Sequence, residues 1–338
     1  MKELILNIGS KSNLKRSFDR HLYFFLKYLS FKKFYNLCIA FIEFKLKIAN
    51  CKSFPAYLRF ETSSVCNLRC AGCAIGGATN KSIAQNSNAF VSFDNFKKNI
   101  ADFLPYLLKV NLYDEGEPLL NKEIYKIISY LNSQNVCSCI STNFSIKFSE
   151  NDLKNLVESK LDHLIIALDG YDQESYSKYR IGGDFQLVMQ NLSNLQKLIT
   201  QYNSPMKIET QYIEFPDSDI ETREKVKDLA SSLNVWRHTV IEKGSREGWE
   251  GYYFKGTPDQ RRELGCYYIW FSGSILTNGE YYCCDFGEDT GMEVIGNAAD
   301  FKTKNLHNNE FTKNIRKSFK KGELNKICAI CPQTSKKI

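Results

Sequence analysis

The chain has 338 residues, of which 43% are hydrophobic, so it can bury a substantial core in two domains or one large one. Its net charge of +7 comes from the N-terminal segment, because residues 1–55 carry eleven Lys and Arg against three acidic residues. The net charge of the remaining residues is about −1. This distribution gives no reason to expect a nucleic-acid partner. The sequence shows neither a secretory signal nor an apolar run of roughly 18 residues, so we expect a cytoplasmic protein without a membrane span.

Residues 14–48 alternate apolar and basic clusters at roughly helical spacing, which predicts a helical segment over residues 1–54. Two interpretations are open. Basic amphipathic helices favour anionic membrane surfaces or a partner protein. Most amphipathic helices instead pack their apolar face on their own protein. We therefore expect a lid docked on the following domain with its lysines in water, and contact with a membrane surface is the less favoured alternative.

Six short strand-like runs alternate with helical stretches across a domain expected at residues 55–245. The predicted strands are residues 56–61, 107–113, 136–142, 163–168, 207–215 and 236–242. Helices are predicted between them, including residues 121–134 and 219–233. Parallel neighbours need such crossovers, and six units are fewer than the eight of a closed barrel. We expect an α/β fold with a partial (β/α)6 TIM-like barrel, whose chemistry lies at the carboxyl ends of the strands.

After residue 245 the alternation stops, and residues 246–338 are expected to form a small α+β cap. The stretch 273–284 contains two β-rich runs around Asn278-Gly279, the pair that favours a short hairpin turn. A basic helix is predicted over residues 309–321. The sequence therefore predicts a hairpin followed by a helix.

The strongest local motif is Cys66-x3-Cys70-x2-Cys73, which lies shortly after the first predicted strand. In a reducing cytosol, grouped cysteines more often bind metal or take part in chemistry than form disulfides. A [4Fe–4S] cluster usually takes four cysteines, so three would leave one iron open. The alternative is a zinc knuckle completed by a distant His or Cys.

This motif after a first strand, at the start of a six-unit βα series, resembles the radical SAM (S-adenosylmethionine) superfamily, and the resemblance covers about residues 56–338. It implies a SAM-binding [4Fe–4S] cluster on the three cysteines. The run from Asp114 to Pro118 is similar to the family's GGE motif, which meets the SAM amino group. Gly116 and Glu117 match that motif, and Glu115 stands where a glycine is usual.

Three further stretches resemble SAM-binding segments of the family. Ser141 and Asn143 correspond to its TN turn near the SAM ribose. Asp169 belongs to a turn similar to S-x-D-G, with Ala167 in place of the serine. Arg180 lies where related enzymes often place an arginine near the SAM carboxylate. Each satellite motif also has a simpler interpretation, as a turn glycine, a turn or cap asparagine or a solvated carboxylate.

The C-terminal cysteines are similar to those of the twitch and SPASM caps of the family, which hold auxiliary [4Fe–4S] clusters. The expected ligands are Cys266, Cys284, Cys328 and Cys331. Four ligands close a cluster, so we expect one auxiliary cluster in addition to the one that binds SAM. The doublet of Cys283 and Cys284 leaves the hairpin ligand ambiguous, and a four-cysteine zinc ribbon is the alternative.

The resemblance implies an oxidoreductase or epimerase that splits SAM reductively and takes a hydrogen atom from a small-molecule substrate, such as a carbohydrate or an aminocyclitol. A reductase such as flavodoxin or ferredoxin would be its partner. Electron transfer to the auxiliary cluster would give oxidation, and hydrogen return from a thiol would give epimerisation. The candidate thiols are Cys283, Cys139 and Cys137, although burial in the protein interior is the favoured explanation of the last two. A peptide maturase and a non-enzymatic zinc or electron-transfer protein are the competing hypotheses.

Overall fold

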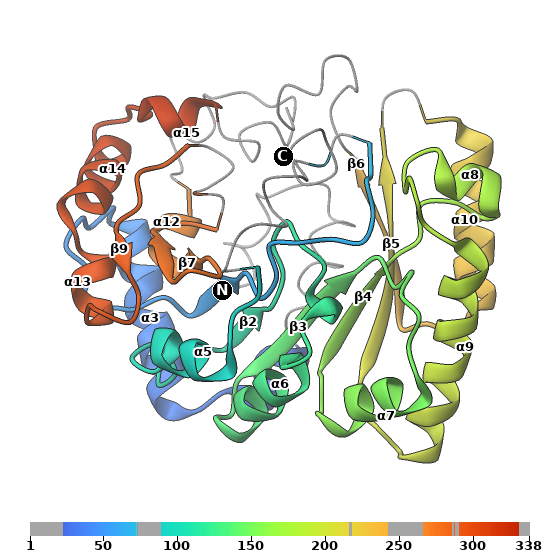
Figure 1. The fold of residues 1–338 in the computed structure, drawn as a ribbon. Helices are drawn as coiled ribbons and strands as arrows, with labels where there is room; N and C mark the ends of the chain where they lie inside the picture. The colour runs from blue at the N-terminus through green and yellow to red at the C-terminus, as the bar shows by residue number, and fades with distance from the viewer. Residues whose placement is uncertain are drawn as a thin grey trace.

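The computed structural model describes residues 23–71, 73, 89–215, 218–242, 266–285, 287 and 291–330. Its centre is a parallel sheet in which six strands follow one another in chain order (Figure 1). They are β1 (Tyr57–Phe60), β2 (Lys109–Asn111), β3 (Cys137–Thr142), β4 (His163–Ala167), β5 (Lys207–Glu214) and β6 (Arg237–Glu242). Each lies within its predicted range. The predicted fold class is therefore confirmed, and the sheet formed by the described residues does not close.

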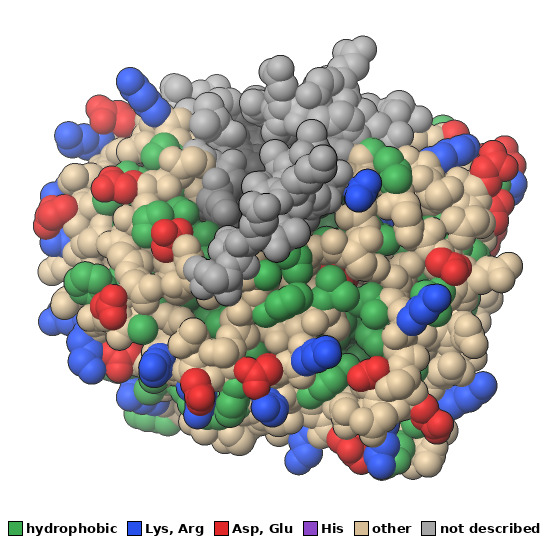
Figure 2. Space-filling model, viewed as in Figure 1, with side chains coloured by type: hydrophobic (Ala, Val, Ile, Leu, Met, Phe, Trp, Pro, Cys, Tyr) green, Lys and Arg blue, Asp and Glu red, His purple; other side chains and the backbone are tan. Residues whose placement is uncertain are grey.

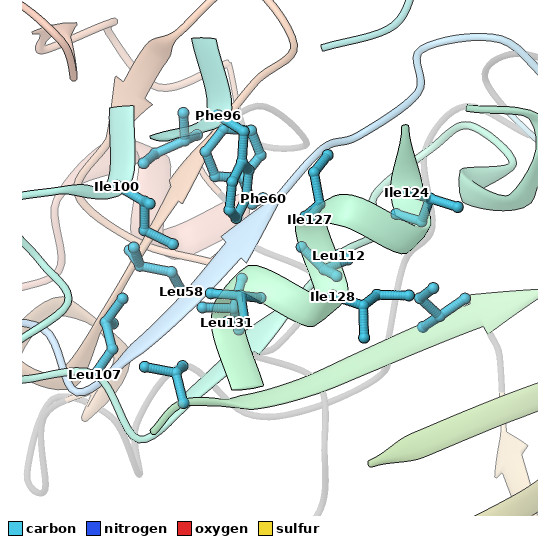
Figure 3. Close-up of a cluster of buried hydrophobic side chains, with 14 of the residues drawn as sticks. Leu58, Phe60, Phe96, Ile100, Leu107, Leu112, Ile124, Ile127, Ile128 and Leu131 are labelled. Atoms are coloured by element: carbon cyan, nitrogen blue, oxygen red, sulfur yellow. The ribbon is translucent and has the colours of Figure 1, made fainter. Parts of the chain in front are cut away.

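The two faces of this sheet carry different side chains because neighbouring residues of a strand point in opposite directions. Even-numbered residues such as Leu58, Ile140 and Leu164 lie in the large hydrophobic core. Figure 3 shows part of this core, where the rings of Phe60 and Phe96 have centroids 4.7 Å apart. Each large apolar side chain buried in this way stabilises the fold by roughly 1.5–3 kcal/mol. Odd-numbered residues turn to the inner face.

The connecting helices cover the outer face of the sheet (Figure 1). They are α5 (Phe93–Ile100), α6 (Ile124–Ser133), α7 (Glu150–Glu158), α8 (Gln173–Ser177), α9 (Phe185–Gln201) and α10 (Ile220–Ser232), with a 3-10 turn at Pro118–Leu120. Ser149 and Asp219 begin α7 and α10 by accepting a hydrogen bond from the third helical N–H. The helices predicted over residues 121–134 and 219–233 are confirmed as α6 and α10.

The sheet continues beyond β1 with strands from the C-terminal part of the chain. β7 (Ser272–Ile275) pairs in parallel with β1, and β8 (Glu280–Tyr282) and β9 (Gly296–Asn297) follow antiparallel. The predicted hairpin is confirmed, and Gly279 in its turn has φ of +87°, which glycine adopts without strain. The hairpin thus belongs to the same nine-stranded sheet as the barrel strands.

The remaining C-terminal helices are α12 (Tyr268–Phe271), α13 (Thr303–His307), α14 (Glu310–Lys320) and α15 (Lys326–Ile330). α14 confirms the basic helix predicted over residues 309–321. Its Arg316 is fully buried. The guanidinium donates hydrogen bonds to the carbonyl oxygens of Ile269, at 2.8 Å, and Ala49, at 3.0 Å. This side chain therefore fastens α14 to α12 and to the segment that precedes β1.

Replacing Arg316 with Met is expected to lower the free energy of unfolding by about 2–5 kcal/mol, because two buried carbonyl oxygens lose their donor. Urea unfolding under anaerobic conditions measures the change. Lys317→Met is the matched control, since Lys317 is exposed on the same helix. Equal stability of the two variants would contradict the role given to Arg316.

The described part of the N-terminal segment lies on the barrel. Residues 23–28 form a short helix whose Phe24 and Tyr28 are buried against Cys137. The Phe24 ring stacks on that of His163 with centroids 5.2 Å apart, and the Tyr28 hydroxyl donates to Asp162 at 2.6 Å. The expected docking is therefore observed. The next helix, α3 (Phe31–Lys45), differs from expectation because three of its four buried side chains, Lys33, Asn36 and Glu43, are polar.

The face shown in Figure 2 carries acidic and basic side chains interspersed around its rim, with apolar side chains nearer its middle, among the residues described. Within the described residues no helix is both long enough and apolar enough to cross a membrane.

Candidate active site

The loop Cys66–Cys73 follows β1 and is held by the loops that follow β3 and β4. The Arg69 N–H donates to the carbonyl oxygen of Ile181 at 2.9 Å, beyond β4. The Asn67 side chain donates to the carbonyl oxygen of Ser145 at 2.7 Å, beyond β3. The cysteine loop is therefore built into the carboxyl end of the sheet, where the sequence analysis expected it.

The structure brings the three cysteines of this loop into one small apolar cluster, whose members include Cys66, Leu68, Cys70, Cys73, Tyr179 and Phe215. N–H groups point at two of the sulfurs. The Leu68 N–H lies 3.4 Å from Cys66 Sγ, and the Asn143 side-chain nitrogen lies 3.7 Å from the same atom. Arg180 Nη1 lies 3.6 Å from Cys70 Sγ. Such donors stabilise negative charge on metal-bound thiolates.

This donor set fits an iron–sulfur cluster. Burial raises the pKa of Cys66 to about 12 and also raises the pKa of Cys70, so without a metal both thiols stay protonated at neutral pH, and a bound metal would displace these protons. Among the described residues no three His, Cys, Asp or Glu side chains meet closely enough to hold one metal ion. What favours a cube is the set of donors around the sulfurs, because cluster thiolates commonly accept hydrogen bonds of the kind that Cys66 and Cys70 receive here.

Glu117 is 2% exposed and joins three loops. Its Oε1 accepts hydrogen bonds from the Thr142 hydroxyl at 2.8 Å and the Leu119 N–H at 3.1 Å, and its Oε2 accepts one from the Asn143 N–H at 2.8 Å. The Glu117 N–H donates to the carbonyl oxygen of Val65 at 2.8 Å. Burial raises its pKa to about 7, although these hydrogen bonds favour the charged form. Sequence analysis missed this network, because its members come from separate loops.

Gly116 and Gly170 each lie in close contact with the backbone of another segment. A Cβ atom on Gly116 would lie 1.9 Å from the carbonyl oxygen of Ser63, and one on Gly170 would lie 2.2 Å from the backbone nitrogen of Tyr176. Contacts this short do not occur, so any side chain at either position would displace a loop. The glycines therefore serve the packing of neighbouring loops.

Asp169 and Arg180 form a buried ion pair beside the cysteine loop. Arg180 Nε lies 2.5 Å from Asp169 Oδ2, with side-chain exposures of 15% and 0%. Asp169 Oδ1 accepts a hydrogen bond from the Ile213 N–H at 2.7 Å, which fixes the carboxylate against β5. Because the guanidinium also contacts Cys70, the pair connects the ends of β4 and β5 to the cysteine loop.

Asp169→Asn is expected to raise the KM for SAM about 10–100-fold in an assay of 5′-deoxyadenosine formation, because the Arg180 guanidinium, predicted to meet the SAM carboxylate, is then no longer held in place by an ion pair. Iron content should not change. Glu310→Gln is the matched control, since its ion pair with Lys313 lies on the solvent side of α14. An unchanged KM would contradict the predicted contact between Arg180 and SAM.

The remaining predicted residues of the SAM site lie at the end of β3. Ser141 is half-buried on the same strand face as Cys139. The Asn143 side chain donates to the Asn67 side-chain oxygen at 2.9 Å and accepts from the Ser145 N–H at 2.8 Å. Asn143 thus holds the cysteine loop through Asn67, so its side chain is more than an ordinary cap.

Arg59 of β1 forms a second buried network that the sequence analysis did not identify. It lies 2.5 Å from a carboxylate oxygen of Asp114 and 3.0 Å from one of Asp285, the residue after Cys284. The two carboxylates come from the loop after β2 and from the end of the hairpin. The sequence did contain one indication of this network, a charged side chain inside a strand that was predicted to be buried. The two partners of Arg59 are too distant in the sequence to be identified from it.

The inner face of the sheet holds a chain of three buried groups. Cys139 Sγ lies 3.4 Å from His163 Nδ1, and His163 Nε2 lies 3.0 Å from Glu209 Oε2. The side chains come from β3, β4 and β5 and have at most 1% exposure. Cys137, two residues before Cys139, lies lower in the same face under the N-terminal helix, where burial raises its pKa.

The C-terminal cysteines are distributed over several elements. Cys266 precedes α12, Cys284 follows β8 and Cys328 lies in α15, while Cys331 lies outside the described residues. Cys283 is fully buried in the hydrophobic core, with its Sγ 3.4 Å from the sulfur of Met292. Burial raises the pKa of Cys283 to about 11. Its surroundings are those of a packing residue.

Curated relatives match part of the chain. The probable GTP 3′,8-cyclase of Methanococcus maripaludis is 25% identical over 150 residues, which are 44% of this chain and 48% of that protein. The GTP 3′,8-cyclase of Clostridium acetobutylicum is 31% identical over 160 residues, 46% of this chain and 47% of that protein. The chain thus spans about half the length of the curated relatives it matches.

Solved structures match a larger share of this chain than the curated relatives do. SuiB of Streptococcus suis bound to S-adenosylmethionine has a TM-score of 0.63 at 15% identity, covering 93% of this chain and 76% of that one. SuiB bound to its precursor peptide SuiA has a TM-score of 0.62 at 15% identity, covering 86% and 72%. At this identity the likeness concerns the fold alone.

The sequence model of the radical SAM superfamily matches residues 60–230, about half of the chain. This range includes the cysteine loop and the loops after β2, β3 and β4 described above. Members of the superfamily use SAM, a [4Fe–4S] cluster and a reductant. The chain belongs to the radical SAM superfamily.

Proposed function

We propose that this chain is a radical SAM oxidoreductase or epimerase that removes a hydrogen atom from a small substrate, such as a carbohydrate or an aminocyclitol. The observation that carries the proposal is the gathering of the cysteine loop with Glu117, Asn143 and Arg180 at one end of the sheet. These side chains come from loops after three different strands. Chemistry in folds of this kind occurs at that end.

Cys66, Cys70 and Cys73 would hold the SAM-binding cluster and leave one iron open. A reduced cluster held there would supply the electron for splitting SAM into methionine and a 5′-deoxyadenosyl radical, which would take hydrogen from the substrate. The Leu68 N–H and the Arg180 guanidinium stabilise the thiolates. The expected reductant is a flavodoxin or a ferredoxin.

We assign the contacts with SAM to residues from the loops that follow β2, β3 and β4. Arg180 would bind the SAM carboxylate, and Asp169 fixes the guanidinium for that task. Ser141 and Asn143 would lie near the ribose. Glu117 supports the same region in a positioning role, since three hydrogen bonds within the protein already engage its carboxylate. Gly116 belongs to this support, because it allows the loop after β2 to touch the one that follows β1.

A second, auxiliary [4Fe–4S] cluster in the twitch- or SPASM-like region 246–338 belongs to the proposal. Its ligands would be Cys266, Cys284, Cys328 and Cys331. Cys284 is favoured over Cys283, because the Cys283 thiol is fully buried against the Met292 sulfur, whereas Cys284 is 9% exposed at the edge of the same cluster. Asp285 next to it is tied through Arg59 to Asp114, so the two proposed cluster regions share one ion-pair network.

Cys139 is the better-placed hydrogen-atom donor for an epimerase. It lies on the inner face, whereas Cys283 lies in the hydrophobic core and Cys137 lies under the N-terminal helix. His163 and Glu209 hold it in one orientation, which suits directed hydrogen return. Without such a return, oxidation through the auxiliary cluster is the proposed outcome.

The test is anaerobic SAM cleavage in deuterated buffer with reconstituted protein and candidate sugars and aminocyclitols. Substrate-dependent 5′-deoxyadenosine supports the proposal. Solvent deuterium in the product indicates thiol-mediated return, and a two-electron oxidised product indicates oxidation. Two clusters require about eight iron atoms per chain. Zinc without iron would favour the non-enzymatic alternative and overturn the proposal.

A peptide maturase is the second candidate. The likeness in fold to SuiB, which has been solved with a precursor peptide, favours it. The same assay separates the two, because a maturase would form 5′-deoxyadenosine in response to peptides and not to sugars.

A further inference from the structure

Helix α3 packs on the protein through its polar side. Lys33, Asn36 and Glu43 are each 4% exposed. The Lys33 ammonium donates to the carbonyl oxygen of Asn135. Asn36 exchanges two hydrogen bonds of 2.9 Å with the backbone of Phe54. These contacts fix the rotation of the helix about its axis.

Glu43 completes this attachment at the end of α3. Its carboxylate accepts hydrogen bonds from the Lys52 N–H at 2.5 Å and from the Ser53 hydroxyl at 2.5 Å. Glu43 is the one acidic residue of α3, and it lies on the buried side. The opposite side of the helix therefore presents no carboxylate.

That opposite side is apolar and exposed. We define the outer face of α3 as the exposed apolar residues Phe31, Phe34, Tyr35, Phe41, Ile42 and the adjoining Leu46. Phe31 is 86% exposed, Tyr35 61% and Ile42 53%. They recur at helical spacing and so form one stripe. Of the seventeen exposed large hydrophobic residues in the described part of the chain, eight lie between Tyr23 and Leu46. This concentration marks an interaction surface.

The stripe lies within the most basic segment of the sequence. Lys32 and Lys45 are exposed on α3. Residues 1–55 carry eleven basic residues against three acidic ones, whereas the rest of the chain is near neutral. A partner for this surface must therefore offer an apolar interior and a negative boundary.

We propose that the outer face of α3 binds the surface of an anionic lipid bilayer, with its aromatic and aliphatic side chains at the boundary of the acyl region and its lysines among the phosphates. Apolar side chains flanked by lysines are what helices that lie in a membrane interface present. The proposal is independent of the reaction proposed above.

A second copy of the chain is a poorer partner. Symmetric pairing would place the outer face of one copy against that of the other, and so bring two basic segments together. Like charges across an interface oppose association. An anionic bilayer offers the opposite charge together with an apolar layer for Phe31 and its neighbours.

The experiment is flotation of the full-length protein, purified anaerobically, with vesicles of phosphatidylcholine alone or mixed with phosphatidylglycerol. We expect the protein to float with the mixed vesicles and much less with the neutral ones. The triple variant Phe31→Ser, Tyr35→Ser, Ile42→Ser should lower the partition coefficient at least about tenfold. Lys32→Gln with Lys45→Gln should lower it about fivefold per lysine on mixed vesicles only.

The matched control replaces three exposed apolar residues elsewhere, Tyr202→Ser, Ile220→Ser and Phe301→Ser, and should float as the unaltered protein does. All variants change exposed side chains, and circular dichroism confirms that each is folded. Absence of flotation by the unaltered protein, or flotation unaffected by the triple variant, would overturn the proposal. Self-association that the triple variant abolishes, without flotation, would assign the surface to a second copy instead.

Discussion

Replacing Cys66, Cys70 and Cys73 together with alanine is expected to abolish 5′-deoxyadenosine formation and to remove about four iron atoms per chain. The physical reason is that the three thiols share one apolar cluster, in which N–H donors point at two of the sulfurs. Nucleoside analysis and iron determination on anaerobically reconstituted protein measure both changes.

Cys38→Ala is the control, because Cys38 is exposed on α3 and belongs to neither proposed cluster. It should retain full iron and full activity. A fall from about eight irons to about four in the triple variant supports an independent auxiliary cluster, and a fall from about four to none argues against it. Unchanged SAM cleavage would reject the cysteine assignment.

Gly116→Ala is expected to lower 5′-deoxyadenosine formation about 100-fold and to cost about 1–3 kcal/mol of stability. The new Cβ would lie 1.9 Å from the carbonyl oxygen of Ser63, which is far shorter than a van der Waals contact. One of the two backbone segments must therefore move. That movement breaks the hydrogen bond from the Glu117 N–H to Val65, just before Cys66. Single-turnover assays and urea unfolding measure the two effects.

Gly322→Ala separates lost activity from lost stability. Gly322 follows α14, has φ of +74° and has open space around its Cα, so alanine there costs about 1 kcal/mol through backbone conformation alone. Activity should be unchanged. If Gly116→Ala behaves like Gly322→Ala, the loop contact with Ser63 is not needed for catalysis.

The sequence by itself determined the six strands, the hairpin and helix α14, because short β-rich runs, turn pairs and helical periodicity are local properties. It also determined the cysteine loop, since Cys66, Cys70 and Cys73 lie within eight consecutive positions. Gly116, Asn143 and Asp169 could be identified from the sequence for a related reason, since each lies within three residues of the end of a predicted strand. Parallel strands bring such residues to one edge of the sheet.

Only the tertiary structure decided which distant groups meet. β7 pairs with β1 across more than two hundred residues, and Arg59 joins Asp114 to Asp285, which no local pattern encodes. The orientation of α3 was predicted wrongly for the same physical reason. Hydrophobic periodicity identifies two sides of a helix. The side that is buried is selected by hydrogen bonds that Lys33 and Asn36 donate to, and Glu43 accepts from, backbone groups elsewhere in the fold.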